Sequence, residues 1–248
     1  IRNSVAVNNP EPARGALSRR NVEAVRRDAL ANFAAQNRAV TKDDYIVRAY
    51  SMPAKFGSIA KAFVEQDDQI ASEADLNRTE LNQFALNLYT LGYDENKNFT
   101  PLNDAVKFNL VNYLKQYRML TDSVNIKTAY IINIGVDFEI IVSETYNSNE
   151  VLLRCINVVK DFFNNEKMEI GKPIFKNTLL TEISLVEGVI SVASLEIFNI
   201  CDESRGYSGN AYNIEAATRK NIIYTSLDPS VFEVKYPNKD IRGKVTNY

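Results

Sequence analysis

The chain has 248 residues, of which 45% are hydrophobic and 24% are charged, and both values are ordinary for globular proteins. The formal net charge is −2, so no basic field is available to attract nucleic acid or an anionic membrane. There is no histidine, which excludes Ser-His and Cys-His nucleophiles and histidine metal sites. No apolar run approaches the roughly 20 residues that a membrane-spanning helix needs.

The two cysteines and the first residue bear on the setting of the chain. Cys155 and Cys201 lack metal-binding or redox spacing, so we expect both to be reduced and structural, in a cytosolic or particle setting. No signal-peptide pattern is present. Because the sequence begins with Ile1 rather than Met, we expect it to be part of a longer chain.

The first half of the sequence predicts a strand and two helices before a second strand. The strand and a Pro/Gly-rich connection occupy residues 1–17. Ser18 is a candidate N-cap for a helix in which Val22, Val25, Ala29 and Phe33 share one face. A second helix is predicted to begin near Thr41 and to end by Pro53 and Gly57, followed by a strand over 58–65; the acidic residues 65–76 suggest a loop or module boundary.

The stretch "RAVTKDDYIV", residues 38–47, combines a lysine, two aspartates and a tyrosine. Such a cluster can serve catalysis or metal binding. However, Thr41 followed three residues later by Asp44 has the spacing of a capping box. Asp43 and Asp44 would then lie in the first helical turn, where the helix dipole favours negative charge by about 0.3–1 kcal/mol each. We therefore interpret the stretch as a helix start.

The second half predicts helices and strands in alternation. Thr100 is the expected N-cap of a helix with Pro101 at its first position and a buried stripe from Leu102 to Tyr117. A long β region is expected over 125–146, and the alternation of apolar residues from Ile134 to Val142 within it predicts a half-buried strand. The remaining predictions are a helix from Asn147 with Glu150 as cap partner, a short helix within 170–188, a strand over 189–200, and an extended tail from Cys201 that can pair with its own sheet or a neighbouring chain.

Two segments share an order of helix, helix and strand. Lys42 and Tyr45 in the first correspond to Lys172 and Phe175 in the second. We therefore predict an α+β fold with duplicated helix-helix-strand modules, antiparallel or mixed sheets and an extended β tail. The predicted units are a first module over 1–66, a connecting helical segment over 67–128, a second module over 129–200 and the tail over 201–248.

The remaining motifs supply no catalytic set. Asp94, Asn96 and Asn98 have calcium-loop spacing, but the glycine and final acid that an EF-hand requires are absent. "GYSG" at 206–209 is not a nucleophile elbow. We predict no catalytic, cofactor-binding or metal-binding residues and no cofactor. Seven tyrosines are candidate core or interface residues: Tyr113, Tyr117, Tyr130, Tyr146, Tyr207, Tyr212 and Tyr224.

Three sequence boxes stand out. The first is "R-A-V-T-x-x-D-Y" at 38–45, the second "R-x-L-T-x-x-V-x-V" from Arg118 to Ile126, and the third is "G-x-P-x-Y" with its following "V-x-G-V", here starting at Gly171 with Phe175 in the tyrosine position. In this order they resemble the baseplate J-like family of wedge subunits in contractile phage tails and related injection machines, most closely its form in T-even-type phages. The boxes cover about residues 15–198. The tail from 201 to 248 matches no box.

The resemblance implies a structural, non-enzymatic subunit of the virion tail baseplate that is assembled in the host cytoplasm. It implies self-association as a homodimer, a ring around the tail hub, contacts with other wedge proteins, and rearrangement when the sheath contracts. Two alternatives stay open. One is a carboxylate-dependent tail hydrolase, which would need an acid pair roughly 5–9.5 Å apart. The other is a ligand- or receptor-binding module that uses the Gly/Tyr-rich segment 205–213.

Overall fold

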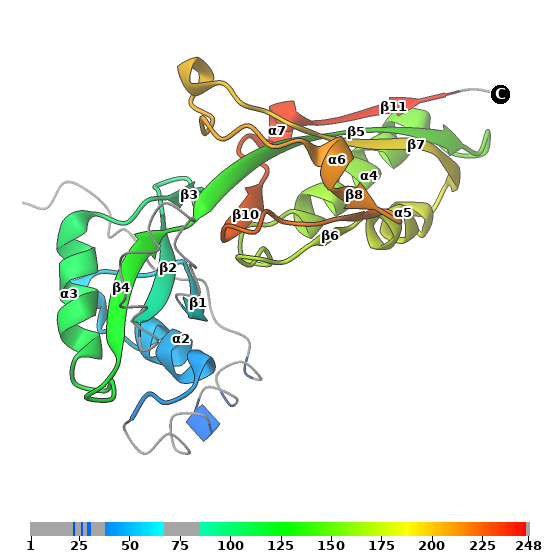
Figure 1. Ribbon diagram of the computed structural model, residues 1–248. Helices are drawn as coiled ribbons and strands as arrows, with labels where there is room; N and C mark the ends of the chain where they lie inside the picture. Colours follow the sequence, from blue (N-terminus) through cyan, green and yellow to red (C-terminus); the bar gives the residue numbers. More distant parts are fainter. Residues whose placement is uncertain (1–21, 23–25, 27–28, 31–37, 67–84, 247–248) are drawn as a thin grey trace, which may run out of the picture.

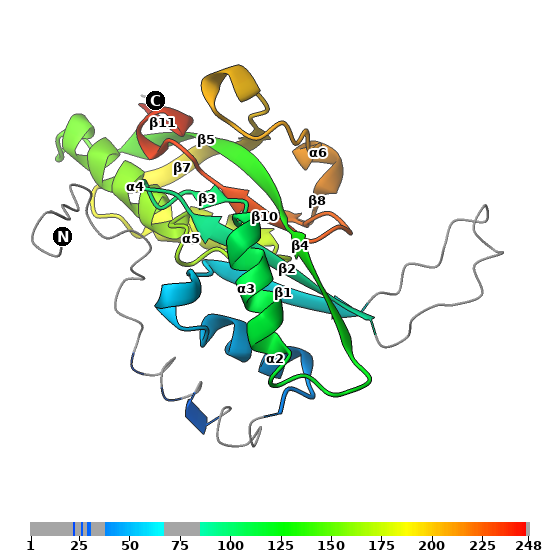
Figure 2. The ribbon, with the colours of Figure 1, turned by 90° about the vertical axis from the view of Figure 1, so that its left-hand side faces the viewer.

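The computed structural model describes residues 22, 26, 29–30, 38–66 and 85–246 of the chain. Residues 38–66 and 85–128 form one lobe, here called the N-terminal lobe, and residues 129–246 form the C-terminal lobe (Figure 1). Both lobes combine helices with mixed sheets, so the predicted α+β class is confirmed. Figure 2 shows the strand β4 (Ser123–Thr128) of the N-terminal lobe running on into the long strand β5 (Tyr130–Val142), which is the central strand of the C-terminal lobe.

The sheet of the N-terminal lobe is centred on β2. The strand β1 pairs with it antiparallel, β4 pairs with it parallel, and β3 continues the sheet beyond a turn. The helix α2 contacts β1, and α3 packs beside α2 and β4. The bounds are α2 Lys42–Tyr50, the 3₁₀ helix η1 Ala54–Phe56, β1 Lys61–Gln66, β2 Ala85–Tyr93, β3 Phe99–Thr100, α3 Asp104–Leu114 and β4 Ser123–Thr128.

The start of α2 has the predicted capping box. The Thr41 hydroxyl accepts a hydrogen bond from the Asp44 N–H at 3.2 Å, and the Asp44 carboxylate accepts from the Thr41 N–H at 2.8 Å and the Val40 N–H at 3.0 Å. Partial burial raises the pKa of Asp44, but these hydrogen bonds outweigh it and lower the pKa overall. The carboxylate therefore serves the helix start.

Thr41→Ala is expected to lower the free energy of unfolding by about 0.5–2 kcal/mol, because the N–H of Asp44 loses its acceptor. Urea unfolding followed by far-UV circular dichroism measures this change. Thr41→Ser keeps the hydroxyl and is the matched control. A Thr41→Ala variant as stable as the serine variant would contradict the cap interpretation.

The C-terminal lobe is built around β5. The strand β7 pairs with it antiparallel, while β11 pairs with Val136–Ile140 in parallel and β10 pairs with Tyr130–Asn133 in parallel. A separate three-stranded sheet has the order β6-β9-β8. The bounds are β5 Tyr130–Val142, α4 Ser148–Phe162, β6 Ile174–Phe175, α5 Lys176–Ser184, β7 Val189–Asn199, the 3₁₀ helix η3 Glu203–Arg205, α6 Ile214–Ala217, β8 Thr218–Arg219, β9 Ile222–Ile223, β10 Ser230–Glu233, α7 Pro237–Asp240 and β11 Ile241–Val245.

The helices α4 and α5 cover one face of this sheet. Their buried residues, which include Cys155, Val159 and Leu179, join the core formed by alternate residues of β5 from Ile132 to Ile140. On the edge of this core the strand β11 presents Gly243 directly beside Phe138. A β-carbon at Gly243 would lie 2.6 Å from the Phe138 ring, so the ring fills the space that any other residue would need.

Sheet pairing does not follow the predicted divisions of the chain. The pairing of β1 with β2 and of β2 with β4 joins residues before 67 to residues up to 128 in one sheet. Likewise, β10 and β11 belong to the sheet of residues 129–200. Of the two alternatives for the tail, pairing with its own sheet is the one that this chain adopts.

Four predicted elements need correction. The helix expected from Pro101 begins at Asp104, because Asn103 provides the N-cap and Thr100 ends β3. The strand β2, within the expected helical connection, lacks clear alternation because it is buried on both faces. The strand β5, predicted to be half-buried, is buried on both faces over residues 131–136. At α4, Asn147 caps the helix, while Glu150 pairs with Arg154 instead of capping.

Of the predicted repeat, the described residues show the complete order of helix, helix and strand in the second copy only. Helices α4 and α5 precede β7, and α2 precedes β1. However, α5 begins at Lys176, four residues after the position that aligns with the start of α2 at Lys42, because Ile174 and Phe175 pair with β9 first. The helix predicted over 18–37 lies mostly outside the described residues, as do the strand over 1–17 and most of the boundary at 65–76. Within it, Val22 and Ala29 are helical and exposed.

Candidate functional site

A groove with a volume of about 560 Å³ lies at the junction between the two lobes. One wall is the turn between β2 and β3, residues 94–98. The opposite wall comes from the end of α4 with its following turn, and from the segment that links β10 to α7. The groove is therefore lined by both lobes, and any relative motion of the lobes would change its shape.

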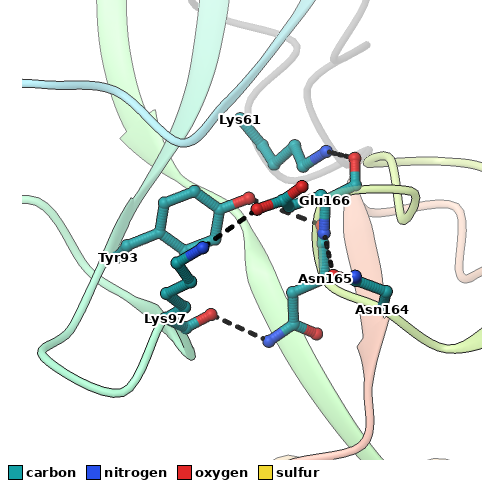
Figure 3. Close-up of polar contacts among 6 residues, drawn as sticks. All are labelled: Lys61, Tyr93, Lys97, Asn164, Asn165 and Glu166. Atoms are coloured by element: carbon teal, nitrogen blue, oxygen red, sulfur yellow. Dashed lines mark hydrogen bonds and ion pairs between the residues drawn. The ribbon is translucent and has the colours of Figure 1, made fainter. Parts of the chain in front are cut away.

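Polar contacts join the two walls of this groove (Figure 3). The Lys97 ammonium lies 3.1 Å from the Glu166 carboxylate, and the Lys97 carbonyl accepts a hydrogen bond from Asn165 Nδ2 at 3.0 Å. Both side chains of the ion pair are more than one third exposed, so the pair itself contributes little, about 0–1 kcal/mol. Together with the Lys97–Asn165 hydrogen bond, the ion pair helps to define the relative position of the two lobes.

A lysine and a tyrosine of the N-terminal lobe reach the same turn (Figure 3). Lys61 Nζ donates to the Glu166 carbonyl at 2.8 Å, and the Tyr93 hydroxyl lies 3.5 Å from the Asn165 carbonyl. Burial lowers the pKa of Lys61. Burial, assisted by the nearby Glu166 charge, raises the pKa of Tyr93 to about 12. Both side chains are positioned as hydrogen-bond donors to this turn.

Glu233 is the buried centre of the junction, with 1% of its surface exposed. Its Oε1 accepts from the Phe99 N–H of the other lobe and from Asn165 Nδ2 at 3.2 Å, and its Oε2 accepts from Asn133 Nδ2 at 2.8 Å. Burial raises the pKa of Glu233 although these hydrogen bonds favour the carboxylate. One carboxyl group thus connects β3, β5, β10 and the turn after α4.

An apolar cluster lies beside this polar centre and also contains residues of both lobes. It combines Leu91 and Phe99 of the N-terminal lobe with Ile131, Ile170 and Val231 of the C-terminal lobe. Apolar packing therefore holds the two lobes together, and the hydrogen bonds of the buried Glu233 define the relative position of their facing surfaces.

The groove does not have the composition of a hydrolase site. Of its lining residues, only Glu166 carries a carboxylate, and that carboxylate is paired with Lys97. An acid pair of the kind that a glycosidase uses is not formed there. No group of three or more metal-binding side chains occurs among the described residues. Cys155 is buried, Cys201 is exposed, and both are free thiols.

The sequence boxes at 38–45 and 118–126 lie side by side in the N-terminal lobe. The Ala39 N–H donates to the Tyr117 carbonyl at 2.8 Å, and the Tyr45 hydroxyl donates to the Asp122 carboxylate at 2.6 Å. Tyr45 is almost fully buried. Ala39, Tyr45 and Asp122 of these two boxes therefore serve packing and hydrogen bonding within the N-terminal lobe.

The other singled-out motifs are also occupied by structural contacts. Asp94 Oδ1 accepts from the N–H groups of Asn96 and Asn98, both at 2.8 Å, so the rejected calcium loop is a tight turn and forms one wall of the groove. In the 205–213 segment, Tyr207 donates to Asp240 at 2.6 Å and Tyr212 to the Tyr224 carbonyl at 2.7 Å. Of the seven tyrosines, Tyr130, Tyr146 and Tyr224 are the most exposed.

Sequence reasoning missed Lys97, Glu166 and Glu233 as a group. Lys97 and Glu166 lie in short polar segments, none of the three residues belongs to a motif, and their sequence separations exceed 65 residues. The only available signal was Glu233 itself, a charged residue between apolar neighbours in "VFEV". Among the described residues, no helix is long and apolar enough to cross a membrane.

Comparison with family models gives no match to this sequence, and comparison with curated proteins gives none either. Among solved structures, the chain is similar to a chain in the cryo-EM structure of the anti-feeding prophage (AFP) baseplate, 6-fold symmetrised. The TM-score is 0.50, the sequence identity is 15%, and the match covers 87% of this chain and 42% of that chain. The chain thus spans about two fifths of the baseplate chain that it matches, and the likeness establishes a shared fold.

Proposed function

We propose that this chain is a structural part of the baseplate of a contractile tail or related injection machine, and that it acts through protein–protein interfaces. The observation that carries the proposal is the fold likeness to an anti-feeding prophage baseplate chain over 87% of this chain. It is supported by the three sequence boxes, which resemble a baseplate family in the same order. The finer assignment is a wedge subunit that resembles the T-even form, joins wedges into a ring and works without catalysis.

The two-lobe architecture supplies a mechanism for this role. Each lobe has its own hydrophobic core, and a smaller mixed cluster joins them. Rigid lobes of this kind can keep their cores while an interface between copies repacks, as in other rigid-body transitions. In the proposed role, the junction transmits the rearrangement that accompanies sheath contraction.

Deleting the coding sequence from its genome tests the assembly role. We expect electron microscopy of the resulting particles to show sheaths and tubes without complete baseplates, and expression of the full protein in trans to restore them. Location in the tail baseplate, with assembly in the host cytoplasm, predicts that antibody labelling marks the tail end. Normal baseplates in the deletion strain would refute the proposal.

The mass of the purified chain in solution tests self-association. We expect light scattering to give the mass of a homodimer over a wide range of concentrations. A stable dimer of this kind needs an interface that buries more than about 1,000 Å². Leu120 of the N-terminal lobe and Leu227 of the C-terminal lobe are large apolar residues that are fully exposed. The solution masses of the Leu120→Asp and Leu227→Asp variants are therefore the first to compare with the mass of the unchanged chain. A monomer at every concentration would contradict the homodimer while leaving contacts with other baseplate proteins in place.

A further inference from the structure

The groove at the lobe junction carries excess positive charge. Four lysines line it, Lys97, Lys160, Lys235 and Lys239, against the single carboxylate of Glu166. Lys97 forms an ion pair with that carboxylate. Lys160 Nζ donates to Asn238 Oδ1 at 2.7 Å, and Lys235 donates to the Gly206 carbonyl. Both acceptors are neutral, although the Lys235 charge also acts on the buried Glu233 two residues earlier.

The Nζ of Lys239 lies 5.6 Å from the centre of the Tyr236 ring. A cation over an aromatic face keeps its full charge and is only moderately stabilised. Among the described residues, none of Lys160, Lys235 and Lys239 forms an ion pair. The groove is therefore a local positive site on a chain whose formal net charge is −2.

The amide side chains at the groove add donors of hydrogen bonds. Asn164 Oδ1 already accepts from the Glu166 N–H at 3.0 Å, and Asn238 Oδ1 already accepts from Lys160. Their exposed Nδ2 groups are thus left to donate. Phe163, Tyr236 and Pro237 supply apolar surface along the same walls. An occupant must offer several acceptors, negative charge and some apolar contact.

From these features we propose that the groove binds an acidic segment of a protein partner, held by Lys160, Lys235 and Lys239 through its carboxylates. Its volume of about 560 Å³ fits a few side chains of an extended segment. Nucleic acid fits less well, because it needs phosphate contacts along an extended basic surface and the chain as a whole is acidic. The inference deepens the proposed assembly role by naming the chemistry through which a partner is held.

A fluorescein-labelled peptide of about ten residues, in which Glu alternates with Tyr and Ser, probes the groove by fluorescence anisotropy with the full chain. The same peptide with Gln in place of Glu is the neutral control. We expect the acidic peptide to bind about tenfold more tightly than the Gln peptide, and the preference to shrink as salt is raised.

The triple variant Lys160→Gln, Lys235→Gln, Lys239→Gln is expected to weaken binding of the acidic peptide by about tenfold or more. The matched control is Lys115→Gln, Lys172→Gln, Lys220→Gln, which removes the same number of charges from exposed positions outside the groove. We expect the control to change the affinity by less than about twofold. Unchanged circular dichroism and melting temperature verify that both triples are folded.

Three results would overturn the inference. Equal losses of affinity in the two triple variants would mean that overall charge, and not the groove, determines binding. Failure of the acidic peptide to bind at about millimolar concentration would mean that the groove is not a binding site for it. Competition by inorganic phosphate, but not by acetate at equal ionic strength, would identify a phosphate site instead. None of these results depends on baseplate assembly, so they leave the outcome of the deletion experiment intact.

Discussion

Glu233→Ala is expected to lower the free energy of unfolding by about 2–4 kcal/mol, the largest effect of any single polar change at the lobe junction. The substitution leaves the Phe99 N–H, Asn133 Nδ2 and Asn165 Nδ2 without their acceptor. Removing the buried carboxylate also removes its desolvation cost, which keeps the net loss below the sum of three unsatisfied donors. Equilibrium denaturation in urea measures the change.

Hydrogen exchange at the Phe99 amide adds a local readout, because this N–H donates across the junction to Glu233. We expect exchange there to speed up in Glu233→Ala more than in the centre of either lobe. Glu144→Ala is the control for a glutamate on the surface, with an expected change within about 0.5 kcal/mol. If the Glu233 and Glu144 variants proved equally stable, the junction would not depend on the carboxylate.

Glu233→Gln isolates the charge of the same side chain. The glutamine side chain keeps one oxygen, which can still accept hydrogen bonds from the Phe99 N–H and Asn165 Nδ2. Its NH2 group would then face Asn133 Nδ2, and because both are donors they cannot form a hydrogen bond. Asn133 cannot turn its amide over without loss, because its Oδ1 accepts from the Ser208 N–H at 2.6 Å. We therefore expect the glutamine variant to be less stable than the wild type, though less affected than the alanine variant.

The pH dependence of that difference has a defined sign. Burial raises the pKa of Glu233 in the folded protein, so the folded state binds the proton more tightly than the unfolded state. The stability from this group is fully present below the unfolded pKa, near 4.5, and is lost as pH rises through the folded pKa. The stability advantage of wild type over Glu233→Gln should thus shrink on going from acidic to neutral pH. An advantage that grows with pH would show that the hydrogen bonds outweigh burial.

Phe138→Ala is expected to cost about 3–5 kcal/mol, the largest effect in the C-terminal core. The side chain is 1% exposed and lies in the core between β5, α4 and β11. Its ring covers Gly243, which pairs with it across the strands. The alanine variant would leave a cavity where the ring now holds β11 against β5. Phe108→Ala, at a site that is 67% exposed on α3, is the control for loss of an aromatic ring.

A double-mutant cycle with Gly243→Ala tests the contact directly. Alone, Gly243→Ala should cost about 1–3 kcal/mol, because its β-carbon would lie 2.6 Å from the Phe138 ring and 2.7 Å from Leu152. In the Phe138→Ala background the new methyl group enters vacated space, so the double variant should be more stable than the sum of the single effects predicts. Additive losses would mean that Gly243 is required for reasons unrelated to Phe138.

The sequence by itself determined features that depend on neighbouring residues. The capping box at Thr41 and Asp44, the start of helix α4 at Asn147, and the strand that became β7 all follow from local spacing. Helix ends and amphipathic faces are local because their hydrogen bonds and periodicity span only a few residues. The α+β class follows from the order of such elements.

Only the tertiary structure decided how the parts meet. Whether residues after Cys201 pair with β5 depends on hydrogen bonds to residues 100 or more positions earlier, and no local pattern encodes that choice. The same applies to β2, since burial on both faces removes the alternation that marks a strand. The junction is the clearest case: Glu233, Phe99, Asn133 and Asn165 carry no motif, and the fold alone brings one carboxylate to three donors from separate elements.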